Sequence, residues 1–181
     1  MNKALIIIDF VNDFVADGGK LTCGEPAQKI DKALAETISR FAGDGGFIVA
    51  ATDCHTENDI YSPENGLFPA HCIAGSSGCE LYGMTAEAVE RVRPEQLIRF
   101  SKTRYSAFAG TGLDMMLRAR NVTEVFLTGV CTDICVLHTA VDAYNLGYKI
   151  NIYESCVASF NEIGHNFALA HFKNTLGAAV L

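Results

Sequence analysis

The sequence alternates between short, continuous apolar runs and longer segments in which apolar residues recur at helical spacing. Residues 4–8 are apolar throughout and are followed by Asp9, which is typical of a strand covered on both faces. Residues 26–42 place apolar side chains on one helix face and are followed by Gly43, a residue that often ends a helix. The expected strands are 4–8, 47–52, 96–100, 122–127, 149–153 and 178–181, and the expected helices are 26–42, 85–92, 112–120, 132–146 and 161–174.

This strand–helix–strand rhythm predicts a parallel sheet that is covered by helices on both faces. We therefore expect one domain over residues 1–181, with a three-layer α/β/α, doubly wound, mostly parallel sheet of about six strands. Residues 54–83 interrupt the rhythm as a long irregular connection rich in Gly, Pro, Asn and Ser. Loops of this length in a compact domain are usually functional.

The composition of the chain argues against several classes of protein. With 181 residues, 49% hydrophobic and 19% charged, the chain can bury a core. Its net charge of -7 and its lack of a Lys/Arg cluster argue against a nucleic-acid partner. No apolar run reaches the ~20 residues that span a bilayer, and the first residues lack the length and cleavage site of a signal peptide. We therefore expect a cytoplasmic protein with no membrane partner. Its seven scattered cysteines, without a CxxC pair, are expected to be free thiols.

Chemically active residues follow four of the expected strands. Asp9, Asp53, Lys102 and the turn that contains Cys135 come after strands one to four. The carboxyl ends of parallel strands meet at one edge of the sheet, where sites form, so these side chains should converge. Thr132 is expected to cap the helix after strand four. Cys135 would then lie in its first turn, where backbone N–H groups lower a thiol pKa and can receive an oxyanion.

Three of these side chains could together catalyse the cleavage of an amide or an ester. Asp9 would take the thiol proton of Cys135, Lys102 would stabilise the thiolate, and the sulfur would attack a carbonyl carbon. The sequence thus favours a cysteine-nucleophile hydrolase. Simpler interpretations remain for each residue taken alone: a cap for Asp9, a solvated charge for Lys102 and a buried helix cysteine for Cys135.

A second group of polar residues lies in residues 53–72. Asp53 and His55 share one face of an extended strand end, whereas Cys54 points away. His71 follows in the irregular connection, and Cys72 is a weaker ligand candidate because it would have to face the same way as His71. Imidazoles with carboxylates suit Zn, Fe or Mn. The alternative is a polar loop with structural histidines. The carboxylates between the two histidines are Glu57, Asp59 and Glu64.

Five motifs carry a family resemblance: Ile8-Asp9-Phe10-Val11-Asn12-Asp13-Phe14, Asp53-x-His55, Phe68-Pro69-x-His71-Cys72, Lys102-x-x-Tyr105-Ser106-Ala107-Phe108 and Gly129-Val130-x-Thr132-Asp133-x-Cys135-Val136. Together these motifs resemble the isochorismatase-like cysteine hydrolases and, within them, the nicotinamidases (pyrazinamidases). They occur in family order over residues 4 to about 180. The resemblance implies a catalytic triad of Asp9, Lys102 and Cys135, a cis peptide between Val130 and Cys131, and an oxyanion hole of the Cys131 and Cys135 backbone N–H groups.

The resemblance also implies a metal site, with one departure. Many nicotinamidases have a third histidine a few residues after Asp-x-His, where this chain has Asp59 or, at the longer spacing, Tyr61. We expect Glu64 to replace it and to complete a site with Asp53, His55 and His71, as in streptococcal-type nicotinamidases.

The implied activity is conversion of nicotinamide to nicotinate and ammonia through a thioester in NAD salvage, with pyrazinamide as a further substrate. Zinc is the expected ion, with manganese or iron as alternatives, and it would bind the pyridine nitrogen. Phe14, Phe68 and Tyr105 are candidate walls for the ring. A homo-oligomer is expected. Other family hydrolases, acting on a different amide, N-carbamoyl or vinyl-ether substrate, and a binding module without turnover, remain alternatives.

Overall fold

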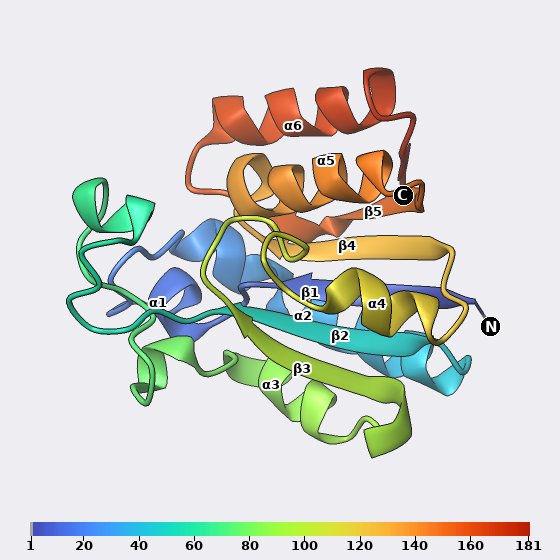
Figure 1. Cartoon of the computed structure of the whole chain (residues 1–181), viewed down its shortest axis with the longest axis horizontal. Helices are drawn as coiled ribbons and strands as arrows, with labels where there is room; N and C mark the ends of the chain where they lie inside the picture. The colour runs from blue at the N-terminus through green and yellow to red at the C-terminus, as the bar shows by residue number, and fades with distance from the viewer. Residues whose placement is uncertain (1) are drawn as a thin grey trace.

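The computed structural model describes residues 2–181, whose strands form one six-stranded sheet in the order β3-β2-β1-β4-β5-β6. Every adjacent pair is parallel. The predicted α/β class, with a parallel sheet between helical layers, is therefore confirmed (Figure 1). The strands are β1 (Lys3–Ile8), β2 (Phe47–Asp53), β3 (Leu97–Lys102), β4 (Glu124–Val130), β5 (Lys149–Ala158) and β6 (Ala179–Val180).

Helices cover both faces of this sheet. The α-helices are α1 (Asn12–Val15), α2 (Glu25–Gly43), α3 (Gly83–Glu90), α4 (Leu113–Arg118), α5 (Leu137–Asn145) and α6 (Glu162–Asn174). Shorter turns are the 3-10 segments η1 (Pro63–Gly66), η2 (Ser77–Cys79) and η3 (Pro94–Gln96), and the π-helical turn η4 (Thr132–Val136). No helix in residues 2–181 is long and apolar enough to cross a membrane.

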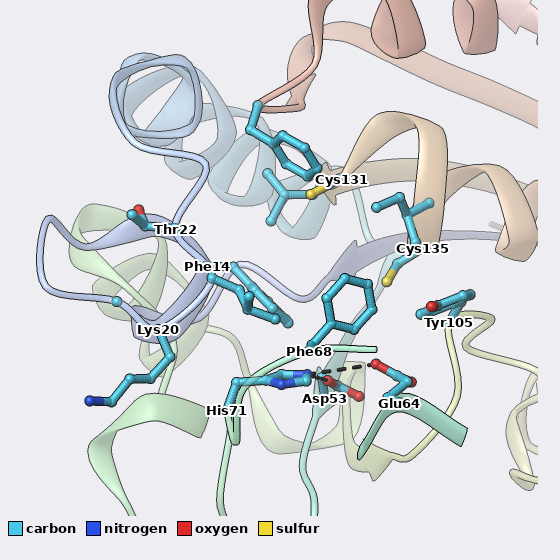
Figure 2. Close-up of a pocket in the computed structure, with 15 residues that line it drawn as sticks. Phe14, Lys20, Thr22, Asp53, Glu64, Phe68, His71, Tyr105, Cys131 and Cys135 are labelled. Carbon is cyan, nitrogen blue, oxygen red and sulfur yellow. Dashed lines mark ion pairs between the residues drawn. The ribbon is translucent and has the colours of Figure 1, made fainter. Parts of the chain in front are cut away.

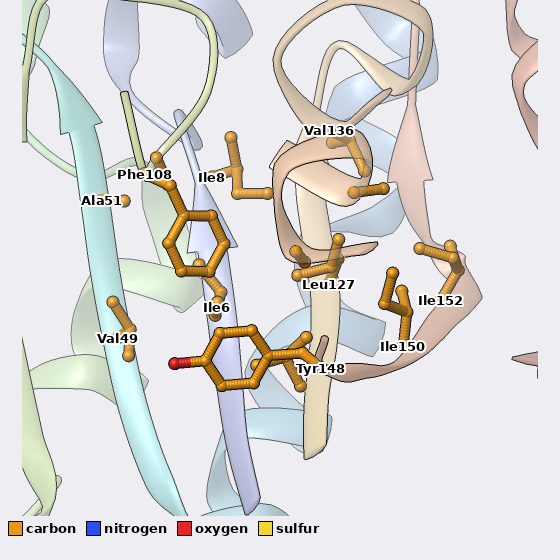
Figure 3. Close-up of a cluster of buried hydrophobic side chains, with 14 of the residues drawn as sticks. Ile6, Ile8, Val49, Ala51, Phe108, Leu127, Val136, Tyr148, Ile150 and Ile152 are labelled. Atoms are coloured by element: carbon orange, nitrogen blue, oxygen red, sulfur yellow. The ribbon is translucent and has the colours of Figure 1, made fainter. Parts of the chain in front are cut away.

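The core has one apolar cluster on each face of the sheet. Strand β1 runs through the middle of the sheet, and its side chains alternate between the two clusters. Ile6 and Ile8 belong to the cluster under α4, α5 and α6, which Figure 3 shows around Leu127 and Val136. Leu5 and Ile7 belong to the cluster under α2 and α3. Because β1 is apolar on both sides, its continuous apolar run in the sequence is explained.

The strand order places a topological switch point at β1. The chain moves outward from β1 to β2 and β3, and then crosses back to β4 on the other side of β1. In doubly wound sheets, ligand sites form outside the carboxyl ends of the strands at such a point. Gly129 brings the two strands close together there, because a Cβ on Gly129 would collide with the backbone of Ile8.

The structure differs from the predicted elements in three places. The short helix α1 was not predicted, because four residues are too few to show helical spacing. Strand β5 extends beyond the predicted end at residue 153 because its pairing with β4 shifts register after Ile152, so that the intervening Glu154 and Ser155 are exposed. The predicted helix at residues 132–146 is instead a π-helical turn followed by α5.

Candidate active site

Asp9, Lys102 and Cys135 meet at the carboxyl edge of the sheet. Asp9 follows β1, Lys102 is the last residue of β3, and Cys135 lies in the turn after β4. The Nζ atom of Lys102 is 2.7 Å from Oδ2 of Asp9 and 4.0 Å from Sγ of Cys135. All three residues are buried. The convergence expected from the strand ends is therefore present, and the three catalytic roles remain predictions.

Burial and neighbouring charges shift the pKa values of all three residues. Burial opposes the charge of Lys102, but Asp9, Cys135 and Asp53 outweigh it and raise the pKa of Lys102. Burial raises the pKa of Asp9 to about 6, against the attraction of Lys102. Burial and the Asp9 carboxylate raise the pKa of Cys135, so the expectation of a lowered thiol pKa is wrong. These shifts favour the protonated form of the Cys135 thiol, beside the Asp9 carboxylate.

The turn that carries Cys135 is π-helical rather than the expected first turn of an α-helix. Thr132 is its first residue and not its N-cap, which is Cys131. The Thr132 hydroxyl instead lies 2.9 Å from Nδ1 of His165, a contact that fixes the turn to α6. The peptide between Val130 and Cys131 is cis, as the resemblance implied. The assignment of the Cys131 and Cys135 N–H groups to an oxyanion hole stays a prediction.

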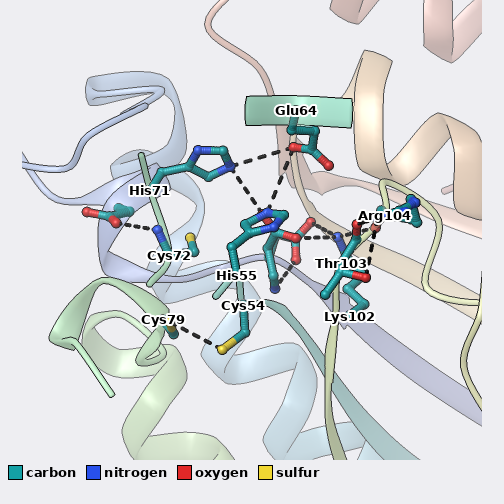
Figure 4. Close-up of polar contacts among 12 residues, drawn as sticks. Cys54, His55, Glu64, His71, Cys72, Cys79, Lys102, Thr103 and Arg104 are labelled. Carbon is teal, nitrogen blue, oxygen red and sulfur yellow. Dashed lines mark hydrogen bonds and ion pairs between the residues drawn. The ribbon is translucent and has the colours of Figure 1, made fainter. Parts of the chain in front are cut away.

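Asp53, His55, Glu64 and His71 form a second buried group beside the first. Their ligand atoms all lie within 4.8 Å of one another. Nε2 of His55 is 2.8 Å from Oδ2 of Asp53, and Nε2 of His71 is 3.4 Å from the same oxygen and 3.6 Å from Oε2 of Glu64. Figure 4 shows Cys54 directed toward Cys79 and away from this group, as predicted for a strand end.

The four residues fit a divalent metal. Bonds of about 2.1 Å in a tetrahedral zinc shell separate ligand atoms by about 3.4 Å, close to the distances of His71 from Asp53 and Glu64. Within residues 2–181, Nε2 of His71 is a buried nitrogen that makes no hydrogen bond, although Nδ1 of the same ring lies 2.8 Å from the Pro69 carbonyl. A histidine with one anchored and one free nitrogen is typical of a metal ligand.

Other candidate ligands lie outside this group. Cys72, the weaker candidate, has its buried thiol 3.9 Å from the carbonyl of Gly78, and it is not part of the group. Glu57 and Asp59 are also not part of it. Among the carboxylates between the two histidines, only Glu64 therefore joins the ligands. Burial opposes the negative charge of Asp53, but the hydrogen bond from His55, the nearby ring of His71 and the charge of Lys102 lower its pKa, which favours the ionised form that a cation would bind.

One cavity of about 340 Å³ opens on both groups. Figure 2 shows Cys135 facing this space from one side and His71 and Glu64 from the other. The three aromatic residues expected as walls, Phe14, Phe68 and Tyr105, all line it. The sequence did not indicate several other apolar lining residues, because no periodicity marks a side chain that faces a cavity. These missed lining residues include Leu21, Ile134 and Phe160.

The fold and the site define the class of protein. A doubly wound parallel sheet with a buried cysteine, aspartate and lysine at its switch point, beside a metal-ligand group, has the arrangement of a cysteine hydrolase. The isochorismatase domain model matches residues 3–181. The chain belongs to the isochorismatase family.

One relative and two solved structures are similar to this chain over nearly its whole length. The isochorismatase family protein PncA of Bacillus subtilis (strain 168) is 52% identical over 181 residues, with 99% of each chain covered. The crystal structure of nicotinamidase/pyrazinamidase PncA from Bacillus subtilis has a TM-score of 0.96 at 51% identity, covering 99% of each chain. The crystal structure of pyrazinamidase of Pyrococcus horikoshii in complex with zinc has a TM-score of 0.86 at 32% identity, covering 100% of this chain and 99% of that one.

Proposed function

We propose that this chain is a nicotinamidase, which hydrolyses nicotinamide to nicotinate and ammonia in pyridine nucleotide salvage and also accepts pyrazinamide. The observation that carries the proposal is the single cavity onto which the thiol of Cys135 and the metal-ligand group both open. A flat pyridine amide has a reactive carbonyl at one side and a ring nitrogen at the other, so it can use both. The similarity to the nicotinamidase/pyrazinamidase of Bacillus subtilis supports the same substrate class.

Cys135, Asp9 and Lys102 would each have a separate role in the reaction. Cys135 gives its proton to Asp9 as the sulfur attacks the amide carbon, and Lys102 balances the negative charge that develops beside it. The backbone N–H groups of Cys131 and Cys135 would hold the oxyanion. Ammonia leaves with the proton from Asp9, and a water molecule, deprotonated by Asp9, then cleaves the thioester.

The second group would hold the metal and orient the substrate. Asp53, His55, Glu64 and His71 would bind the ion, and a divalent metal there would supply a coordination position for the pyridine nitrogen and so act as a template. Zinc suits two imidazoles and two carboxylates, and manganese and iron are the alternatives. The rings of Phe14, Phe68 and Tyr105 would confine the plane of the substrate.

An ammonia-release screen with metal analysis of the same sample tests this function. We expect turnover of nicotinamide and pyrazinamide by protein that contains about one zinc per chain. Hydrolysis of an N-carbamoyl compound or of isochorismate, without release of ammonia from nicotinamide, would show that the substrate is wrong. A protein that turns over none of these and whose Cys135 resists thiol reagents would be a binding module. The mass in solution tests the expected homo-oligomer.

A further inference from the structure

We propose that Asp13 is a positioning residue that fixes the metal-ligand segment of His71 to the strand end that carries Asp9. Asp13 lies four residues after Asp9 in the same motif, and it belongs neither to the catalytic group nor to the metal ligands. The proposal rests on one part of the proposed function, which is the binding of a metal by Asp53, His55, Glu64 and His71. It requires no particular substrate.

The carboxylate of Asp13 joins two segments that are distant in sequence. Its Oδ2 accepts a hydrogen bond of 2.7 Å from the backbone N–H of Cys72, the residue after the ligand His71. Its Oδ1 accepts one of 3.2 Å from the N–H of Lys20, which lines the substrate cavity. Its backbone carbonyl accepts a further bond of 3.0 Å from Leu21, also in the cavity wall. One residue thus connects the wall of the cavity to the metal-ligand segment.

Two glycines make room for Asp13. A Cβ on Gly78, in η2, would collide with the Asp13 carboxylate. A Cβ on Gly19 would overlap the Asp13 carbonyl oxygen and carbon. These glycines lie on different segments, and each permits a close approach to this one residue. Both segments therefore pack closely against Asp13.

The segment that Asp13 holds has a strained backbone. Cys72 has a φ of 44°, a left-handed conformation that non-glycine residues rarely adopt. Such a conformation persists only where the surroundings enforce it. The hydrogen bond from the Cys72 N–H to Asp13 supplies one constraint, and the bond of 2.8 Å that the Cys72 carbonyl accepts from the His55 N–H supplies another. The carbonyl of Pro69 orients the ring of His71 from the other side. Asp13 would thus fix the backbone of His71 while Pro69 fixes its ring.

Asparagine cannot replace Asp13 in this role, although it has the same shape. Both side-chain contacts of Asp13 are with N–H donors, and each uses its own carboxylate oxygen. An amide has one oxygen and one NH₂ group, so one contact would set a donor against a donor. We expect Asp13→Asn to weaken zinc binding by about 10–100-fold, the usual effect of removing a group that orients a metal ligand.

Competition with a chromogenic chelator measures this affinity with Zn²⁺ alone. Asp13→Asn is compared with Asp17→Asn, because Asp17 is an exposed carboxylate nearby that bonds to Gln28. Gly78→Ala displaces the Asp13 carboxylate without changing its charge and should also weaken zinc binding. Its control is Gly43→Ala, where a Cβ meets nothing within 4 Å. Thermal unfolding of the metal-free proteins accompanies each titration.

The outcomes separate a positioning role from a merely structural one. The proposal is supported if both test variants lose zinc affinity at temperatures at which their metal-free forms remain folded, while both controls keep wild-type affinity. It is overturned if Asp13→Asn or Gly78→Ala, folded at the assay temperature, binds zinc within about threefold of wild type, less than the tenfold lower bound expected. If Asp13→Asn does not fold, Gly78→Ala alone decides. Because no substrate is present, failure of the nicotinamidase proposal would leave this result unchanged.

Discussion

The catalytic group and the metal-ligand group lie side by side but are built differently. Asp9, Lys102 and Cys135 each come directly from, or just after, a strand of the sheet. Of the metal ligands, Asp53 ends β2, whereas Glu64 and His71 come from the long connection that follows it. A strand end is fixed by the packed core on both sides, whereas loop residues tolerate substitution. The position of the proposed nucleophile is therefore fixed by the sheet, whereas the proposed ligand set can vary with the loop.

The side chains of Lys102 and Asp9 connect the two groups. The ammonium of Lys102 lies 2.7 Å from Oδ2 of Asp9 and 3.6 Å from Oδ1 of Asp53. The Asp9 carboxylate also accepts a hydrogen bond of 2.7 Å from the backbone N–H of Asp53. We expect a substitution in one group that does not involve these contacts to leave the structure of the other group unchanged. This separability can be tested.

Removing the nucleophile should have the largest effect. Cys135→Ala should lower the rate of ammonia release from nicotinamide by at least about 10⁴-fold, because no other group can form the thioester. Zinc content should stay at the wild-type level, since Cys135 is not a ligand. In Cys131→Ala the backbone N–H is kept, so turnover should remain at least about 10³-fold above that of Cys135→Ala. Full activity in Cys135→Ala would remove the triad.

Replacing Lys102, which contacts both groups, should destabilise the protein. Lys102→Met leaves the buried carboxylates of Asp9 and Asp53 without their shared cation, which should cost about 3–5 kcal/mol of unfolding free energy. Urea denaturation of metal-free protein measures this cost. Lys149→Met is the control, because its ion pair with Glu124 is solvent-exposed on the lysine side and should contribute less than about 1 kcal/mol. Equal losses in the two variants would contradict the linking role.

A change in the loop should affect the metal alone. Glu64→Gln removes a ligand charge and should weaken zinc binding by at least about 100-fold, as measured by chelator competition. Cys135 should still react with thiol reagents at the wild-type rate, because the catalytic group does not depend on η1. Glu57→Gln is the control, since Glu57 is exposed in the same loop. Loss of zinc affinity in that control would show that the whole loop, and not Glu64, holds the ion.

The same contrast explains what the sequence could predict. The positions of Asp9 and Lys102 were predictable because apolar runs mark where strands end, and parallel strands end at one edge. Spacing alone did not choose among the carboxylates of the loop; the choice of Glu64 came from family resemblance. The π-helical turn that contains Cys135 leaves no periodicity to detect. Phe160 lines the cavity just after the end of β5, and the polar Glu154 and Ser155 concealed the extension of that strand past its register shift.

The smallest effect is expected at Asp59, one of the two positions, with Tyr61, at which the resemblance would place the third histidine of many nicotinamidases. Asp59 lies near the ligands in sequence, but it accepts a hydrogen bond of 3.0 Å from the Tyr61 N–H and is not part of the ligand group. Asp59→Ala should therefore change zinc affinity by less than about twofold, as for a substitution away from a binding site. Chelator competition beside Glu64→Gln measures both on one scale. A tenfold loss in Asp59→Ala would place Asp59 in the metal shell, and the metal site would then draw more of its ligands from the loop than the structure indicates.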